Sequence, residues 1–568
     1  MRFEKSLLAL AAAAAAASLP AVAAVGDINW TESVFSINRD TPADTSGKQH
    51  TGLAWAPDGS NRLFVLEKEG RVRVLSNTFG AGTATWTTFA TMSPIYTQSE
   101  CGLIGMAFDP DFASNGLVYF FVTVGNDEQQ IIRYRDSANV GVERTVVRSG
   151  LPTNGANHDG GGIGFAADGK LYWSIGDLGS GVGVDANLTS LASKVGRANR
   201  DGSLPPDNPF NDGAGSNNDF IYARGFRNPF TMQIQPSTGR IWLNVVGTGY
   251  EQVFVVGRGD HAGYNDYENN QPAGFITPKI VYRTNGTDTR ALQTVTRTAN
   301  VATFTATSNH GFRVGGNLTI AGVGDASFNG ASQYVASVPT PTTFTIRQVA
   351  PDATSSSGQA TTLSQGGCLT GGAFYDGTRA SADYRGNFFY GDCNSGRINR
   401  ARIDAASNEV VATDHWATGI SAQVDVASGP DGALYYTGTN TNNILRAAFN
   451  TSTQGIVIGN QHLRIDEGGA AVTTISLATA PVAPVQVNVA LSAGSSDVSI
   501  AAGATLTFTN VDWMRPQLVR LVAATDVDLA DDAATISASA SGLVTEVVNV
   551  TVLDLDRNPD TIFLDGFD

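Results

Sequence analysis

The chain has 568 residues and a formal net charge of −16 at pH 7. This length is too great for one hydrophobic core, so we expect two to four domains. The acidic balance, with no basic patch, excludes nucleic acid and anionic membrane surfaces as partners; its simplest meaning is solubility.

The first residues have the pattern of a secretory signal peptide. Arg2 and Lys5 precede a Leu/Ala run over 7–19, which a small-residue segment follows at 20–23. The run is shorter than the roughly 20 residues of a membrane span, and no later stretch qualifies. We expect residues 1–24 to be removed, and the mature chain to be soluble, secreted or periplasmic, with no membrane span.

A unit that repeats along the chain predicts the fold. It consists of a turn that commonly contains Asp-Gly or Asn-Gly, a strand of alternating aromatic and aliphatic residues, and another short strand. Repeats of this kind, together with 63 glycines, are typical of an all-β chain and predict a six-bladed β-propeller over 25–288 and 364–449. The six copies begin at Ala56, Phe108, Phe165, Ile234, Tyr384 and Ser428.

Residues 289–363 interrupt these repeats. They are rich in Thr, Ala, Ser and Val, and two of their segments read as strands. We expect a small β-domain inserted in a loop, which a propeller tolerates because a blade does not depend on the length of its connections.

The composition changes again after Phe449. Residues 450–558 alternate between apolar and polar over several strands and predict a β-sandwich. Glu467-Gly468-Gly469, the stretch 508–517 and Val552-Leu553-Asp554 resemble a Calx-β domain. Residues 559–568 form a C-terminal tail without an assigned role.

His158 is the strongest candidate for chemistry. It stands in the segment NHDGGG, on a polar loop that leads into the first strand of the third repeat. Histidine titrates near neutral pH, so one on a glycine-rich loop at a blade mouth can act as a base. Spacing alone leaves a structural role open, in which the histidine caps a neighbouring turn.

Four long motifs resemble one family. They are ECGLIGMAFDPDF from Glu100, NHDGGGIGFAADGKLYWSIGD from Asn157, SKVGRANRDGSLPPDNPF from Ser193 and YARGFRNPF from Tyr222. In order and spacing they are similar to the glucose/sorbosone dehydrogenases. The resemblance covers about residues 45–288 and 365–449.

The resemblance implies an oxidoreductase. In this family a six-bladed propeller holds pyrroloquinoline quinone and a calcium ion in a cleft, where a histidine takes the proton of a sugar's anomeric hydroxyl while hydride passes to the quinone. By motif, His158 matches that base and Asn157 its polar neighbour. Arg227 and Asn228 match the pair that contacts the quinone; without the family, Arg227 could equally be a structural clamp.

Two further residues match the metal site. Gly247 and Thr248 fall where main-chain carbonyls hold the calcium, a hard cation that prefers oxygen ligands.

Four positions depart from the family. Glu100 stands where cofactor-binding members have Gln, Asn394 where they have Lys, and Ala422 and Val424 where two Arg residues bind the cofactor's carboxylates. Each lost cation removes charge-assisted bonds of about 1.5 to 3 kcal/mol. These replacements predict weakened binding in the family's usual pose.

The three cysteines also follow the resemblance. Cys368 and Cys393 flank a loop and strand of the predicted fifth blade, as in family branches that carry a disulfide there. We therefore expect that bond, with Cys101 as the odd thiol.

Acidic residues gather late in the predicted sandwich. They could bind calcium, or form a solvated rim on an acidic protein, and the sequence leaves both open. The residues are Asp526, Asp528, Asp531, Asp532, Asp554 and Asp556.

Two functions therefore compete. The first is an exported dehydrogenase that oxidises the anomeric hydroxyl of an aldose or oligosaccharide and passes electrons to an unknown acceptor. The second is a non-catalytic propeller that binds a glycan or protein, with the Calx-β-like domain serving adhesion. A hydrolase ranks last, because no carboxylate pair or Ser/His/Asp arrangement is evident.

Overall fold

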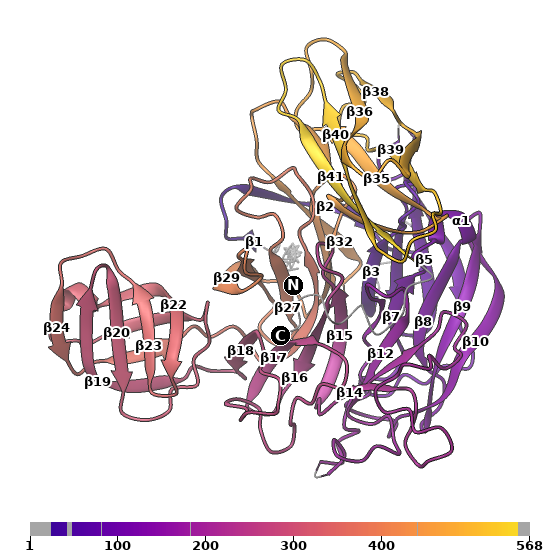
Figure 1. Cartoon of the computed structure of the whole chain (residues 1–568). Helices are drawn as coiled ribbons and strands as arrows, with labels where there is room; N and C mark the ends of the chain where they lie inside the picture. The colour runs from indigo at the N-terminus through magenta and orange to yellow at the C-terminus, as the bar shows by residue number, and fades with distance from the viewer. Residues whose placement is uncertain (1–23, 42–47, 81, 182, 440, 555–568) are drawn as a thin grey trace, which may run out of the picture.

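The computed structural model describes residues 24–41, 48–80, 82–181, 183–439 and 441–554 (Figure 1). The expected signal peptide, apart from Ala24, and the C-terminal tail lie outside the described residues. The described chain consists of strands and turns with one short α-helix, α1 (Phe112–Asn115), and one 3-10 turn, η1 (Ala326–Phe328). The all-β expectation is confirmed. No described helix has the length and apolar character needed to cross a bilayer.

Six antiparallel sheets make up the largest part of the chain. The first three are β3 (His50–Trp55), β4 (Leu63–Glu67), β5 (Arg71–Ser76) and β6 (Thr85–Thr91); β7 (Leu103–Phe108), β8 (Leu117–Thr123), β9 (Glu128–Ser137) and β10 (Val140–Pro152); and β11 (Ile163–Phe165), β12 (Leu171–Ile175), β13 (Lys194–Ala198) and β14 (Ile221–Arg224). The others are β15 (Asn228–Ile234), β16 (Ile241–Val246), β17 (Tyr250–Val256) and β18 (Ile280–Arg283); β26 (Leu369–Phe374), β27 (Phe388–Asp392), β28 (Arg397–Ile403) and β29 (Val410–Thr418), edged by β1 (Ala24–Val25); and β30 (Gln423–Ser428), β31 (Leu434–Gly438) and β32 (Asn443–Phe449), edged by β2 (Trp30–Ile37).

The first strands of these sheets form a ring. β3, β7, β11, β15, β26 and β30 contact one another in that order, and β30 contacts β3 again. Each glycine-containing turn of the sequence repeat joins a first strand to a second strand, so all six turns lie at one end of the ring. Second strands such as β4, β12, β27 and β31 are buried along their whole length, because neighbouring sheets cover both of their faces.

The N-terminal strand β2 completes the sixth sheet. It pairs with β32 from Trp30 opposite Phe449 to Ile37 opposite Asn443. Trp30 is 5% exposed and packs edge-on against Trp416 at 5.4 Å between ring centroids. The ring is thus closed by strands from the two ends of this part of the chain, a long-range pairing that the repeat pattern did not reveal.

Residues between the fourth and fifth sheets form a separate closed barrel, which stands to one side of the ring (Figure 1). Asn317 and Tyr334 of the barrel are hydrogen-bonded to Asp414 of the fifth sheet. The strands are β19 (Thr289–Thr298), β20 (Val301–Ala306), β21 (Asn317–Ala321), β22 (Gly330–Thr340), β23 (Thr343–Arg347), β24 (Ala353–Ser356) and β25 (Gln359–Thr362).

Two C-terminal sheets share one hydrophobic core. They lie over the end of the ring that carries the six turns, and the Arg385 guanidinium donates two hydrogen bonds of 2.9 Å to Glu546 across this contact. One sheet contains β33 (Ile456–Ile458), β35 (Ala470–Leu477), β39 (Gln517–Ala523) and β37 (Val498–Ala502). The other contains β34 (His462–Asp466), β41 (Glu546–Leu553), β40 (Asp532–Ser539), β36 (Val485–Gly494) and β38 (Thr505–Phe508).

Candidate functional site

His158 lies on the loop before β11, at the end of the ring opposite the repeat turns. Its backbone has φ of +60°, a left-handed conformation that non-glycine residues adopt rarely. The loop passes close to the end of β12, where a Cβ on Gly176 would lie 2.3 Å from the His158 carbonyl oxygen. The position therefore requires glycine at 176, and this contact helps to fix the histidine backbone.

Asp177 orients the His158 side chain. Nδ1 of His158 is hydrogen-bonded to Oδ1 of Asp177, whose side chain is only 3% exposed. A carboxylate accepts, so the bond places the imidazole proton on Nδ1 and leaves the lone pair on Nε2. No described residue is hydrogen-bonded to Nε2, and the imidazole side chain is 16% exposed. The geometry is that of a histidine base held in one tautomer.

Asp177 is the last residue of the motif that begins at Asn157, and no role was predicted for it from the sequence. A signal was present in the strand order. β11 and β12 are antiparallel, with Ile163 opposite Trp173, so a residue just after β12 must lie beside the residues just before β11. A polar residue directly after a buried second strand was therefore a candidate partner for His158.

Glu100 binds two neighbours of the imidazole. Its Oε2 accepts a hydrogen bond of 2.9 Å from the His158 backbone N–H and another of 2.9 Å from the Asn228 side-chain amide. The Asn228 oxygen accepts from the Gly160 N–H at 3.3 Å. The Asn228 amide thus links Glu100 to the His158 loop.

Asn157 and Asp159 flank the histidine and hold the loop differently. The Asn157 side-chain oxygen accepts from the Ser99 hydroxyl at 2.5 Å, and Asn157 itself is exposed. Asp159 is fully buried and accepts from the Cys101 thiol at 3.1 Å. Burial, together with this carboxylate, raises the pKa of the Cys101 thiol to about 12, so the free thiol is an inert structural donor.

Arg227 is the one guanidinium that the family motif brings to this group. Its backbone oxygen accepts from the Asp177 N–H at 2.7 Å, and its Nη1 donates to the Val246 carbonyl at 3.1 Å. Its Nε is buried without a hydrogen-bond partner. Nη1 of Arg227 is therefore bonded within the protein, whereas its Nε has no partner among the described residues.

Gly247 and Thr248 form the turn between β16 and β17. Arg227 lies beside this turn, because its Nη1 donates to the carbonyl of Val246, the last residue of β16. The Thr248 and Gly249 backbone N–H groups both donate to the carboxylate of Glu268. Glu268 was not among the residues selected from the sequence. Its carboxylate and the turn's carbonyls are oxygen donors, which is the chemistry that a calcium ion requires.

Asn394 lies on the turn after β27. Its side-chain amide donates to the Gly367 carbonyl at 3.0 Å, and no hydrogen bond among the described residues joins it to the His158 group. Cys368 and Cys393 are bonded to each other beside it, with Cα atoms 5.3 Å apart. The expected disulfide is confirmed, and Cys101 is the buried free thiol.

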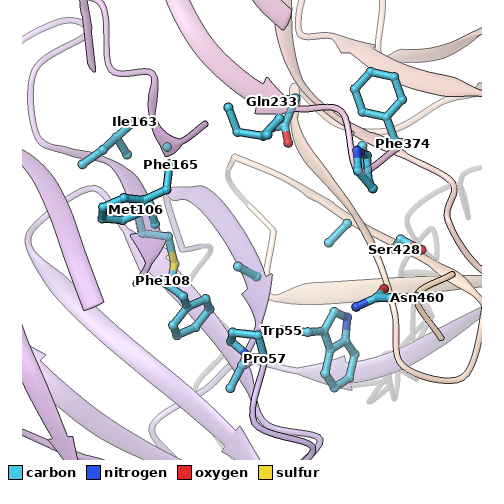
Figure 2. A pocket seen from close by; sticks show the side chains of 18 of the residues that line it. Trp55, Pro57, Met106, Phe108, Ile163, Phe165, Gln233, Phe374, Ser428 and Asn460 are labelled. Carbon is cyan, nitrogen blue, oxygen red and sulfur yellow. The ribbon is translucent and has the colours of Figure 1, made fainter. Parts of the chain in front are cut away.

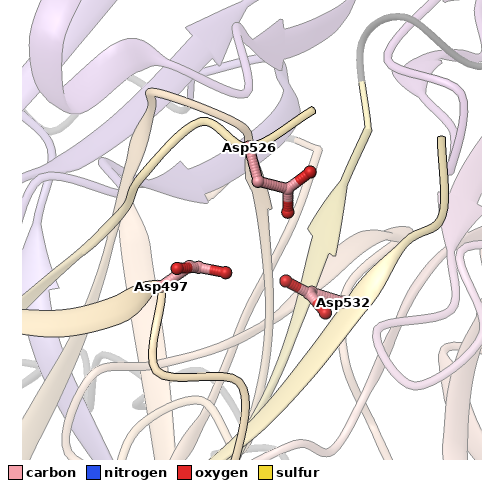
Figure 3. A group of neighbouring side chains, drawn as sticks. All are labelled: Asp497, Asp526 and Asp532. Atoms are coloured by element: carbon pink, nitrogen blue, oxygen red, sulfur yellow. The ribbon is translucent and has the colours of Figure 1, made fainter. Parts of the chain in front are cut away.

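A second acidic group lies in the C-terminal sheets (Figure 3). One carboxylate oxygen from each of Asp497, Asp526 and Asp532 lies within 4.8 Å of the others. The structure thus joins Asp526 and Asp532 of the predicted cluster to Asp497, which the sequence did not single out; Asp556 lies outside the described residues. Calcium binding here stays a hypothesis.

A cavity in the described part of the chain lies away from this site. It has a volume of 570 Å³ and lies between the ring and the C-terminal sheets, and His158 does not line it.

The ring of sheets is similar to known proteins. The glucose/sorbosone dehydrogenase family model matches residues 48–323. Quinoprotein glucose dehydrogenase B of Acinetobacter calcoaceticus is 28% identical over 308 residues, covering 46% of this chain and 63% of that protein. An aldose sugar dehydrogenase of Escherichia coli is 27% identical over 220 residues, covering 37% and 57%. The chain thus spans about three fifths of these relatives' length, and the family resemblance read from the motifs is supported.

Solved structures show the same fold. The apo-form of the soluble aldose sugar dehydrogenase from Escherichia coli superimposes with a TM-score of 0.50 at 17% identity, covering 74% of this chain and all of that one. A glucose dehydrogenase superimposes with a TM-score of 0.51 at 19% identity, with the same coverage. At these identities the likeness supports a propeller-like fold and no more.

The residues present do not fit pyrroloquinoline quinone in the pose that the glucose/sorbosone dehydrogenases imply. The cofactor carries three carboxylates. Glu100 places a further carboxylate against the His158 loop, and Asn394, Ala422 and Val424 supply no cations. Of the residues matched to the cofactor site, which are Glu100, Asn157, Arg227, Asn228 and Asn394, Arg227 is the one cation. The oxygen atoms of Gly247, Thr248 and Glu268 suit a calcium ion better than the residues at the cofactor positions suit the quinone.

Proposed function

We propose that this chain is a dehydrogenase-like protein that oxidises the anomeric hydroxyl of an aldose or oligosaccharide, with His158 as the base. The observation that carries the proposal is the His158–Asp177 pair, because it presents an unprotonated Nε2 on a partly exposed imidazole. The family match and the sugar dehydrogenases among the relatives support the substrate class.

The residues of this chain supply the proton chemistry. Nε2 of His158 accepts the hydroxyl proton as the C1–H bond breaks, and Asp177 stabilises the imidazolium that forms. A quinone would supply the hydride acceptor only if it bound in a pose other than the family's usual one. Calcium, held by the Gly247 and Thr248 carbonyls beside Glu268, would add positive charge next to Arg227.

The proposal extends to architecture and location. The six sheets are the blades of a six-bladed propeller, which the ring of first-strand contacts supports, and the two C-terminal sheets are a Calx-β-like sandwich, which their shared core supports. The signal-peptide pattern of residues 1–24 supports export to the periplasm or medium.

The test is a titration of the purified mature chain with pyrroloquinoline quinone and calcium, followed by dye reduction with a panel of aldoses. The proposal expects sugar-dependent reduction that His158→Ala abolishes while the variant stays folded. Cofactor binding weaker than micromolar is expected from the missing cations. No reduction with any aldose at saturating cofactor overturns the proposal.

One observation favours the second function, a non-catalytic propeller that binds a glycan or protein. Glu100 binds the His158 N–H and the Asn228 amide, so two groups of the quinone motif serve the loop itself. Failure of every cofactor titration, with retained glycan binding, would support this alternative.

A further inference from the structure

The ring and the C-terminal sheets enclose a cavity that the proposed function does not use. Its volume of 570 Å³ is within the roughly 300 to 1,000 Å³ of small-molecule sites. It follows the first strands down to the repeat turns, and residues of β34 and β35 cover it. Figure 2 shows its lining side chains.

Aromatic residues end four of the six first strands at this cavity. They are Trp55, Phe108, Phe165 and Phe374, the last residues of β3, β7, β11 and β26 (Figure 2). The first three are partly exposed. The sequence repeat therefore places aromatic side chains around one end of the ring of sheets.

These aromatic rings are held in place before any ligand arrives. Trp55 packs edge-on against Tyr435 at 4.8 Å between centroids, and Phe165 packs edge-on against Tyr119 at 5.0 Å. Both partners are fully buried. Preformed apolar walls of this kind lower the entropic cost of binding a flat apolar face.

Polar groups with unused hydrogen-bonding capacity line the same space. The Gln233 and Asn460 side-chain amides lie on different sides of the cavity, and neither is hydrogen-bonded to a described residue. Asp425 accepts only from the Leu53 and Val426 backbone N–H groups, at 3.0 and 2.9 Å. Its carboxylate retains lone pairs for a hydroxyl donor.

The charges of the lining favour a neutral ligand. Asp109 and Asp466 are both paired with Arg200, and Asp376 accepts from Nδ1 of His462 at 2.6 Å. Asp425 has no ion pair among the described residues, and its carboxyl, whose pKa burial raises to about 7, opposes an anion where it is ionised. The Arg464 guanidinium in the roof opposes a cation. A neutral molecule with apolar faces and many hydroxyl groups satisfies both conditions.

We propose that this cavity is a binding site for a neutral carbohydrate, separate from the His158 site. The sugar's C–H faces pack on the aromatic rings, and its hydroxyl groups bond to Gln233, Asn460 and Asp425. The proposal does not rest on oxidation at His158.

The test is calorimetric binding of D-glucose, cellobiose and maltotriose to the mature full-length chain, with choline and citrate as charged probes. The proposal expects saturable binding of at least one sugar. The double variant Gln233→Leu/Asn460→Leu should weaken it about tenfold or more, since both amides are lost. The matched control Gln359→Leu, an exposed position on the barrel, should leave binding unchanged.

Each contrary outcome is distinct. Sugar binding that survives the double substitution belongs to another site and overturns the proposal, as does binding of choline or citrate in place of the sugars. Absence of saturable sugar binding at millimolar concentration also overturns it. Dye reduction on the same samples, supplied with pyrroloquinoline quinone and calcium at saturating concentration, separates the two proposals: binding at the cavity without oxidation removes only the proposed dehydrogenase activity.

Discussion

Asp177 Oδ1 accepts a hydrogen bond from Nδ1 of His158, although 19 positions separate the two residues in the chain. We expect Asp177→Asn to lower turnover about 10²- to 10⁴-fold with little change in KM, because an amide can donate to Nδ1 and then leaves the proton on Nε2. Steady-state dye reduction measures this effect.

The control for that variant is Asp185→Asn, which alters another carboxylate–histidine pair, Asp185 with Nε2 of His261 at 2.8 Å. It should retain most of the activity. Equal losses in the two variants would show that Asp177 matters only for stability.

The buried carboxyl group of Glu251 makes the free energy of unfolding depend on pH. It is fully buried, and burial raises its pKa from 4.5 to about 7. Between about pH 4.5 and 7 the folded chain keeps this proton while the unfolded chain loses it, so stability falls as pH rises through this window, by an amount of the order of 3 kcal/mol.

Glu251→Gln should remove that part of the pH dependence. Denaturation midpoints compared at about pH 5 and about pH 8 should differ less in this variant than in the parent chain. Glu143→Gln, at an exposed position, is the matched control and should keep the parent profile. An unchanged slope in Glu251→Gln would contradict the prediction.

The Cys368–Cys393 disulfide should stabilise the fifth sheet. It joins residues 25 positions apart. Closing a loop of that length lowers the conformational entropy of the unfolded chain, which stabilises the folded state by about 3 kcal/mol. The variant Cys368→Ala/Cys393→Ala should unfold at a lower temperature. Cys101→Ser, which keeps a donor to Asp159, should respond to reductant as the parent does.

Arg385 ties the ring to the C-terminal sheets. Its two hydrogen bonds to Glu546 need a planar guanidinium, so Arg385→Lys should weaken the contact by about 1 to 2 kcal/mol. Calorimetry should then show the C-terminal sheets unfolding at a lower temperature than the ring. Arg135→Lys, at the exposed pair with Glu143, should leave the transitions unchanged.

The site was only partly accessible from the sequence. His158, Asn228 and Glu100 were selected by motif, and the structure joins them by hydrogen bonds. Asp177 and Glu268 were missed, because each acts on a residue that lies near it only after the strands have paired.

Local pattern determined the strands and the repeat turns, since alternation and Asp-Gly turns act over a few residues. The disulfide partners were expected only from the family resemblance. Tertiary structure alone decided how the parts meet. It brought β2 to β32 and closed the inserted barrel, and it placed the repeat's aromatic strand ends beneath the C-terminal sheets. These contacts join residues far apart in the chain, and their stability comes from surfaces buried only in the assembled fold.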